Sequence, residues 1–125
     1  MARAVSKYWV LDAVRRYLVE RGYEVVEERD FTLLCHSSNS SLAVRVMLLM
    51  PYGSVLERIW EASSEIRELP YDRVYLAVPS TMLSRVVGKR MSMLRELLEG
   101  YFRIGLLKVA EDGVVEEVIP APLRR

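Results

Sequence analysis

The hydrophobic pattern at the start of the chain predicts an amphipathic helix. Between Val5 and Arg21 the apolar residues recur every three or four positions, the spacing that places them on one face of an α-helix. These residues are Val5, Tyr8, Trp9, Leu11, Val14, Tyr17 and Leu18. Gly22 follows directly, and glycine commonly ends helices because it accepts the left-handed backbone conformation found there. The sequence therefore predicts a helix over 5–21.

Three short stretches after this helix have the composition of β-strands. They are apolar or β-branched and are bounded by polar segments typical of turns. The stretches are Tyr23–Glu28, Phe31–His36 and Leu42–Met50. The last two are separated by Ser37–Ser41, a run of small polar residues. Because the connections are short, we expect three consecutive strands arranged as a meander.

A second helix is predicted after the break at Pro51-Tyr52-Gly53. Ser54 and Glu57 have the spacing of a capping box, in which the serine hydroxyl accepts a hydrogen bond from a free backbone amide of the first turn. The inward face of this helix is predicted to carry Val55, Ile59, Ala62 and Ile66. The helix should end near Leu69-Pro70, since proline does not continue a helix.

The rest of the chain predicts one strand, one helix and a hairpin. Arg73–Val78 has the continuous apolar character of a buried strand. Pro79-Ser80-Thr81 favours the start of a helix, which we expect to run to about Glu99. The hairpin strands are predicted over Ile104–Val109 and Val114–Ile119. Asp112-Gly113 lies between them and suits a tight turn, because glycine accepts a positive φ.

The element order is thus α-β-β-β-α-β-α-β-β, which predicts an α/β (α+β) fold with a mixed sheet flanked by helices on both faces. A right-handed crossover through the helix at Ser54 favours parallel strands starting at Leu42 and Arg73. A length of 125 residues is typical of one domain, so we expect a single domain over 1–125 with a short C-terminal tail at 120–125.

Composition and charge indicate a globular protein and exclude several other classes. With 51% hydrophobic and 28% charged residues the chain is expected to be globular, and its formal net charge of +1 creates no overall attraction to nucleic acid. The single cysteine and single histidine exclude an intrachain disulfide and a cysteine-rich zinc site. No apolar run approaches the roughly 20 residues that span a bilayer, so no membrane contact is expected.

The same features favour a cytoplasmic protein, because the N-terminus lacks the pattern of a signal peptide. Asn39 is the only asparagine and glutamine is absent. Scarcity of thermolabile amides is typical of hyperthermophile proteins, so a thermophilic source is predicted.

Several segments of the chain resemble the restriction-endonuclease-like superfamily, whose signature is the PD-(D/E)XK motif. The segments that carry the resemblance are Arg21–Val26, the meander, Tyr71–Pro79, Ile104–Val109 with Asp112-Gly113, and Val118–Ala121. In that family an aspartate on the second strand and an acid-x-lysine triplet on the third bind a divalent metal and activate a water molecule. The resemblance implies a mixed sheet flanked by helices and a nucleic-acid ligand.

The motif itself is degenerate in this sequence. Asp30 matches the first aspartate, although the preceding proline is missing. In Leu42–Val46, Ala43 stands where the family has its acid and Arg45 where it has its lysine. Arginine is a poor general base because its guanidinium rarely gives up a proton. An ion pair between Arg45 and Asp30 is the structural explanation for a charge in this strand.

We therefore predict a nuclease-fold protein that has lost catalysis and acts as a nucleic-acid-binding or accessory subunit, without a cofactor. The proposed contacts with DNA or RNA are Arg45, Arg85, Lys89 and Arg90. One alternative is an active metal-dependent endonuclease, in which Asp30 and either Glu27 or Glu28 bind Mg²⁺. Another is a structural module for a protein partner or a homodimer.

Overall fold

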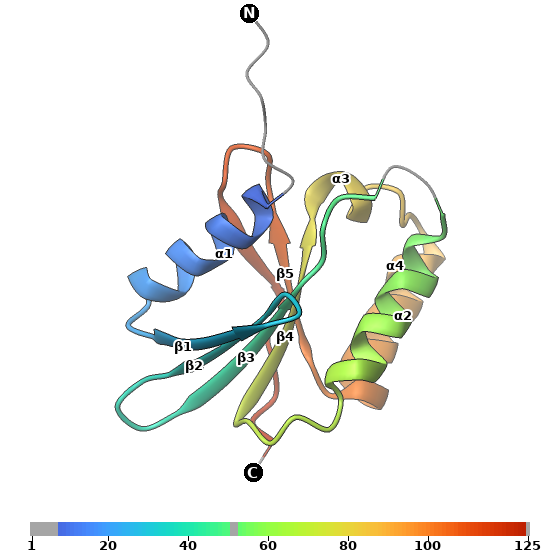
Figure 1. The fold of residues 1–125 in the computed structure, drawn as a ribbon. Coiled ribbons are helices and arrows are strands. Elements are labelled where there is room, and N and C mark those ends of the chain that lie inside the picture. Colours follow the sequence, from blue (N-terminus) through green and yellow to red (C-terminus); the bar gives the residue numbers. More distant parts are fainter. Residues whose placement is uncertain (1–7, 51–52, 125) are drawn as a thin grey trace, which may run out of the picture.

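The sheet is the centre of the molecule (Figure 1). The computed structural model describes residues 8–50 and 53–124, and in this part of the chain the sheet has six strands in the order β1-β2-β3-β4-β5-β6. The strands are β1 (Glu24–Arg29), β2 (Thr32–His36), β3 (Ser41–Val46), β4 (Arg73–Pro79), β5 (Gly105–Val109) and β6 (Val115–Ile119). Neighbours in the chain are thus neighbours in the sheet.

The sheet is mixed, as predicted. The pairs β3–β4 and β4–β5 are parallel, whereas β1–β2, β2–β3 and β5–β6 are antiparallel. In the β3–β4 pair, Leu42 lies opposite Arg73 and Val46 lies opposite Ala77. The predicted parallel pairing of these two strands is confirmed.

Helices cover both faces of the sheet (Figure 1). On one face lies α1 (Trp9–Glu20), which buries Val10, Val14 and Leu18 against the sheet. The predicted start of this helix at Val5 lies outside the described residues. On the other face lie α2 (Val55–Ile66) and α4 (Lys89–Glu96). Within the described residues no helix is long and apolar enough to span a membrane.

Helix α2 begins as the sequence predicts. The Ser54 hydroxyl accepts a hydrogen bond from the backbone amide of Glu57 at 3.3 Å, which satisfies one free amide of the first turn. The four residues predicted to face inward are buried: Val55, Ile59, Ala62 and Ile66. The helix ends at Ile66, a few residues before the predicted end at Leu69-Pro70.

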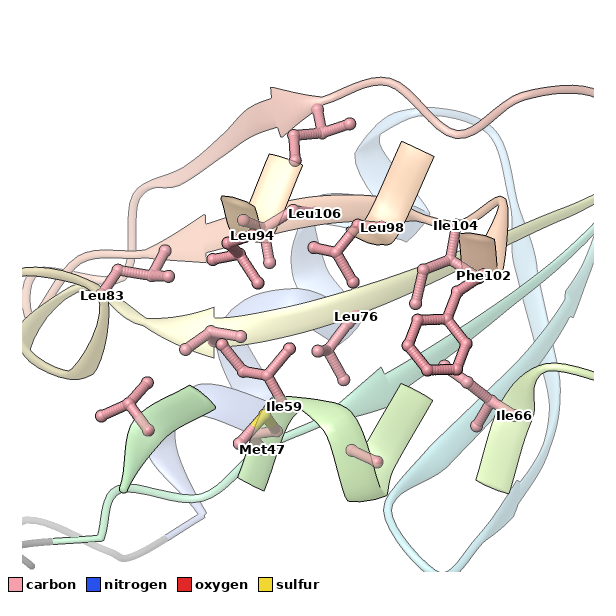
Figure 2. Close-up of a cluster of buried hydrophobic side chains, with 14 of the residues drawn as sticks. Met47, Ile59, Ile66, Leu76, Leu83, Leu94, Leu98, Phe102, Ile104 and Leu106 are labelled. Atoms are coloured by element: carbon pink, nitrogen blue, oxygen red, sulfur yellow. The ribbon is translucent and has the colours of Figure 1, made fainter. Parts of the chain in front are cut away.

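The single helix predicted from Ser80 to Glu99 is wrong. The chain instead forms α3 (Ser80–Leu83), an irregular segment, α4, and the π-helix η1 (Leu97–Phe102). Gly88 separates α3 from α4 with a φ of +61°, a conformation that a continuous α-helix does not allow. Figure 2 shows Leu94, Leu98 and Phe102 of α4 and η1 packed with Leu76 of β4, Leu106 of β5 and Ile104, which directly precedes β5.

The predicted third strand is also too long. Strand β3 ends at Val46, and the segment 47–50 leaves the sheet after the amide of Met47 donates to the carbonyl of Ala77 at 2.9 Å. Leu49 in this segment is exposed, so it does not carry the burial expected of a central strand. Beyond the hydrogen bond of Met47 the segment runs toward the start of α2 at Val55, and the carbonyl of Met50 accepts a hydrogen bond from Arg85.

Candidate nucleic-acid interface

A cavity of about 160 Å³ lies where β3 ends against α2. Its polar wall consists of Arg45 from β3 and Arg58, Glu61 and Glu65 from α2. Phe31 and Met47 contribute apolar wall. We call it the β3–α2 cavity. Two guanidinium groups therefore share a small space with two carboxylates.

Arg45 points into this cavity because of the alternation along β3. Ala43 belongs to the apolar cluster under α2, whereas Leu42, Val44 and Val46 belong to the cluster under α1. Arg45 follows Ala43 by two residues and so lies on the α2 face. Its side chain is 22% exposed and forms an ion pair with Glu65.

The ion pair predicted between Arg45 and Asp30 is wrong. Asp30 lies in the turn between β1 and β2, where it has a φ of +50° and Phe31 a φ of +62°. Two successive positive φ values are those of a type I′ hairpin turn, which aspartate tolerates well. Arg45 lies opposite Thr32, one step further along β2, and within reach of the helix above it.

Of the three motif positions, only Arg45 lines the β3–α2 cavity. Ala43 has no exposed surface, and Asp30 is exposed at the hairpin turn. The candidate replacement acids are engaged elsewhere, since Glu27 pairs with Arg29 and Glu28 pairs with Arg15 of α1. The structure therefore does not bring Asp30, Glu27 and Glu28 together at this cavity.

The residues of the cavity do not fit Mg²⁺. Magnesium takes oxygen ligands in near-octahedral geometry, so it needs carboxylates whose charge is available. Here Glu65 is neutralised by Arg45, and the Arg58 guanidinium is a further positive charge in the wall. Within residues 8–50 and 53–124, no group of three or more histidine, cysteine, aspartate or glutamate side chains is placed to hold a metal ion.

A second cavity, of about 200 Å³, lies beside the first at the start of α2. Arg85 and Arg90 line it, opposite Gly53 and Ser54. The Nη2 atom of Arg85 donates to the carbonyl of Met50 at 2.8 Å, and Met50 also lines the β3–α2 cavity. The two cavities are therefore neighbours along the connection from β3 to α2.

Four arginines thus follow this connection, and we call them the arginine track: Arg45, Arg58, Arg85 and Arg90. Sequence reasoning identified three of them and missed Arg58. The only sequence signal for Arg58 was its place one turn after the helix cap at Ser54. In the structure its side chain lies near Gly53, with nitrogens 3.9–4.0 Å from the position of a Cβ there. Lys89, which was also predicted to bind nucleic acid, is exposed at the first position of α4 and lines neither cavity.

Cys35 and His36 do not form a nucleophile and base. Cys35 is fully buried in the cluster under α1, and desolvation raises the pKa of its thiol to about 11. His36 is exposed, and its ring lies 6.1 Å from that of Tyr71. Successive strand residues point to opposite faces of the sheet, so the two side chains diverge.

The six-stranded mixed sheet, with α1 on one face and the crossover helix α2 on the other, defines a restriction-endonuclease-like fold. Two solved structures share this fold with the chain. The first is an XisH family protein from Nostoc punctiforme PCC 73102, with 16% identity, a TM-score of 0.63, and coverage of 90% of this chain and 99% of that chain.

The second is an fdxN element excision controlling factor protein from Anabaena variabilis, with 18% identity and a TM-score of 0.59. That match covers 88% of this chain and 98% of the other. No protein-family model matches the sequence, and no curated protein matches it. The structural neighbours are therefore XisH family proteins, and what the chain shares with them is the fold.

Proposed function

We propose that this chain is a nuclease-fold protein that has lost catalysis and binds nucleic acid, on its own or as an accessory subunit. The observation that carries the proposal is Arg45, which takes the place of the motif lysine and lies in the β3–α2 cavity as the ion-pair partner of Glu65. A guanidinium in this place binds an anion but does not accept a proton.

The loss of catalysis follows from the chemistry of the motif positions. Metal-dependent hydrolysis of a phosphodiester needs carboxylates that hold the metal and a group that takes a proton from water. Ala43 offers no ligand, and it is buried in the core, where no solvent or metal reaches it. An arginine at the position of the motif lysine is a poor proton acceptor. No cofactor is part of this proposal.

Binding of nucleic acid is supported by the arginine track. Arginine is suited to phosphate because its guanidinium donates two parallel hydrogen bonds to two oxygens of one group. Four such side chains along one connection present a row of donors to a sugar-phosphate backbone. One structural neighbour is an fdxN element excision controlling factor protein, and a role in excision of such an element is consistent with a nucleic-acid ligand.

The first test is binding, measured by fluorescence anisotropy with labelled duplex DNA, single-stranded DNA and RNA at several salt concentrations. Arg45→Ala should weaken binding by about 1–3 kcal/mol and reduce the slope of affinity against salt, as expected for a lost charge-assisted phosphate contact. Arg16→Ala is the matched control, because Arg16 is an exposed arginine of α1 on the other face of the sheet. Equal losses in both variants would refute a specific role for Arg45.

The second test separates this proposal from an active endonuclease. The wild-type protein is incubated with supercoiled plasmid and with RNA in the presence of Mg²⁺ or Mn²⁺. We expect no cleavage above that of a sample containing chelator. Metal-dependent cleavage that is abolished by Asp30→Ala, and unaffected by Glu96→Ala at an exposed position of α4 as control, would establish the endonuclease instead.

A second candidate function, a module for a protein partner, is favoured by one exposed cluster. Trp60 of α2 is 46% exposed and stacks on Tyr101 of η1, with ring centroids 5.7 Å apart and planes at 14°. The guanidinium of Arg67 lies 4.4 Å above the Tyr101 ring. Tryptophan, tyrosine and arginine are the residues most enriched at protein interfaces. Wild-type protein that binds no nucleic acid even at low salt would favour this function.

A further inference from the structure

A separate cavity lies on the other face of the sheet, under the end of α1. Its volume is about 310 Å³, at the small end of the range for pockets that bind small molecules. Its polar wall consists of Arg21, Arg73 and Glu117, with the rings of Tyr17, Tyr23 and Tyr75. The remaining wall consists of leucines from the cluster under α1. This cavity and the arginine track therefore lie on opposite faces of the sheet.

Among the residues that the structure describes, neither arginine of this cavity has a carboxylate partner. Within residues 8–50 and 53–124, the ion pairs at 4.0 Å or less include neither Arg21 nor Arg73. The Arg21 guanidinium instead lies 4.4 Å above the Tyr17 ring, which orients it without neutralising it. Arg73 starts β4 and is half-buried.

The one carboxylate in the wall has a different partner. The hydroxyl of Tyr75 donates a hydrogen bond to the carboxylate of Glu117. Burial, followed by this hydrogen bond, raises the pKa of Tyr75, so the hydroxyl stays protonated and remains a donor. With two guanidinium groups and one carboxylate, the wall carries a net charge of +1 and attracts an anion.

We propose that this cavity binds a small organic ligand that carries a phosphate or carboxylate group. The two guanidinium groups hold the oxygens of that group, since the arginine fork matches both kinds of oxyanion. Tyr17 and Tyr23 contact the organic part of the ligand. A partly desolvated guanidinium without a counter-charge is unfavourable, and a bound anion removes this cost at Arg73.

The test is calorimetric titration of the full chain with three probes: inorganic phosphate, adenosine monophosphate and glutarate. At least one is expected to bind, and comparison of the three separates a phosphate from a carboxylate and shows whether the organic part contributes. Arg21→Ala and Arg73→Ala should each weaken that binding about tenfold or more, as expected for a lost charge-assisted hydrogen bond. Arg16→Ala is the control, because Arg16 lies on α1 but outside this cavity.

Two controls show whether the variants are folded. The melting temperature of every variant is measured, and Arg73→Lys keeps the positive charge but removes the planar pair of donors. Arg73→Lys should fold and bind with intermediate affinity. The proposal is wrong if none of the three probes binds, or if Arg16→Ala weakens binding as much as Arg21→Ala. A loss of DNA affinity in Arg73→Ala equal to that in Arg45→Ala would also overturn it, because the cavity would then belong to a nucleic-acid surface.

Discussion

At the scale of single residues, Arg45 and Glu65 form an ion pair in the wall of the β3–α2 cavity. A phosphate that binds Arg45 must compete with a carboxylate that is already there. The Glu65 side chain is 59% exposed, so the pair contributes only about 0–1 kcal/mol to stability. Under the proposed function, we expect the pair to have its larger effect on the binding of anions.

Glu65→Gln should therefore increase affinity for nucleic acid, because it removes the competing charge and leaves the fold intact. We expect a gain of about threefold to tenfold, equal to about 1 kcal/mol, with little change in melting temperature. Anisotropy titrations at low salt measure the gain. Glu68→Gln is the matched control, since Glu68 is 92% exposed just beyond α2 and does not line the cavity. An unchanged or lower affinity in Glu65→Gln would count against phosphate binding at Arg45.

The buried thiol of Cys35 should make the stability of the fold depend on pH. Burial raises its pKa from the ordinary value of 9.0 to about 11, which means that the folded state favours the protonated thiol. The stabilising contribution is complete below pH 9 and is lost as the pH rises through 11. Unfolding titrations between pH 8 and 11 should show wild-type stability falling more steeply than that of Cys35→Ala. Parallel curves for the two proteins would contradict this.

At the scale of elements, the sequence predicts strands better than it predicts the end of the second crossover helix. Strands β1, β2, β4, β5 and β6 are found within one or two residues of their predicted bounds. The helix from Ser80 fails at Gly88, because a single glycine also occurs inside helices and its positive φ depends on how α3 and α4 dock on the sheet. The backbone conformation of such a glycine is therefore set by tertiary packing.

Gly105 offers a sharp test of close packing at the start of β5. A Cβ at this position would lie 2.5 Å from Cε1 of Tyr75 and 2.6 Å from the amide nitrogen of Ala121. Gly105→Ala should therefore destabilise the protein by about 1–3 kcal/mol through overpacking. The matched control is Gly100→Ala in η1, where a Cβ would meet nothing within 4 Å and helix propensity improves. Denaturant unfolding that ranks Gly100→Ala below Gly105→Ala in stability would contradict the close approach.

At the scale of the whole molecule, β1 and β6 are the edge strands of the sheet that the described residues form. Charged residues dominate the β1 edge: Glu24, Glu27, Glu28 and Arg29. Charges on an edge strand oppose pairing with the edge of another molecule, which is how many β-proteins avoid aggregation. Val26, which is 60% exposed, is the apolar residue that these charges surround.

Replacement of the charged residues on β1 should allow the protein to self-associate through this edge. Glu27→Val combined with Glu28→Val is expected to increase self-association, because the edge then becomes apolar along most of its length. Size-exclusion chromatography over a range of concentrations measures the effect. The control is Glu68→Val combined with Glu96→Val, which removes the same charge from exposed positions away from the strands. Equal self-association in both double variants would refute a role for the β1 edge.

At the candidate site, too, the sequence predicts local features but not contacts that depend on how the helices dock on the sheet. The position of Arg45 on the third strand could be predicted, because alternation along a strand is a local property. Its partner could not, because Glu65 lies twenty residues further along the chain and reaches Arg45 only when α2 docks on the sheet. Pairing with the nearby Asp30 failed because Asp30 lies in the hairpin turn, beyond the paired residues of β1 and β2.

The order of the strands has a consequence for how the chain folds. Since each strand pairs only with its predecessor and its successor, no strand has to insert between two that are already paired. The sheet is able to grow from β1 to β6 while the chain is being synthesised, with each new strand joining the edge left by the one before. Two crossovers, one through α2 and one through the segment from α3 to η1, close the longest loops. Because closing a longer loop costs more entropy, we expect these two to be the slowest steps.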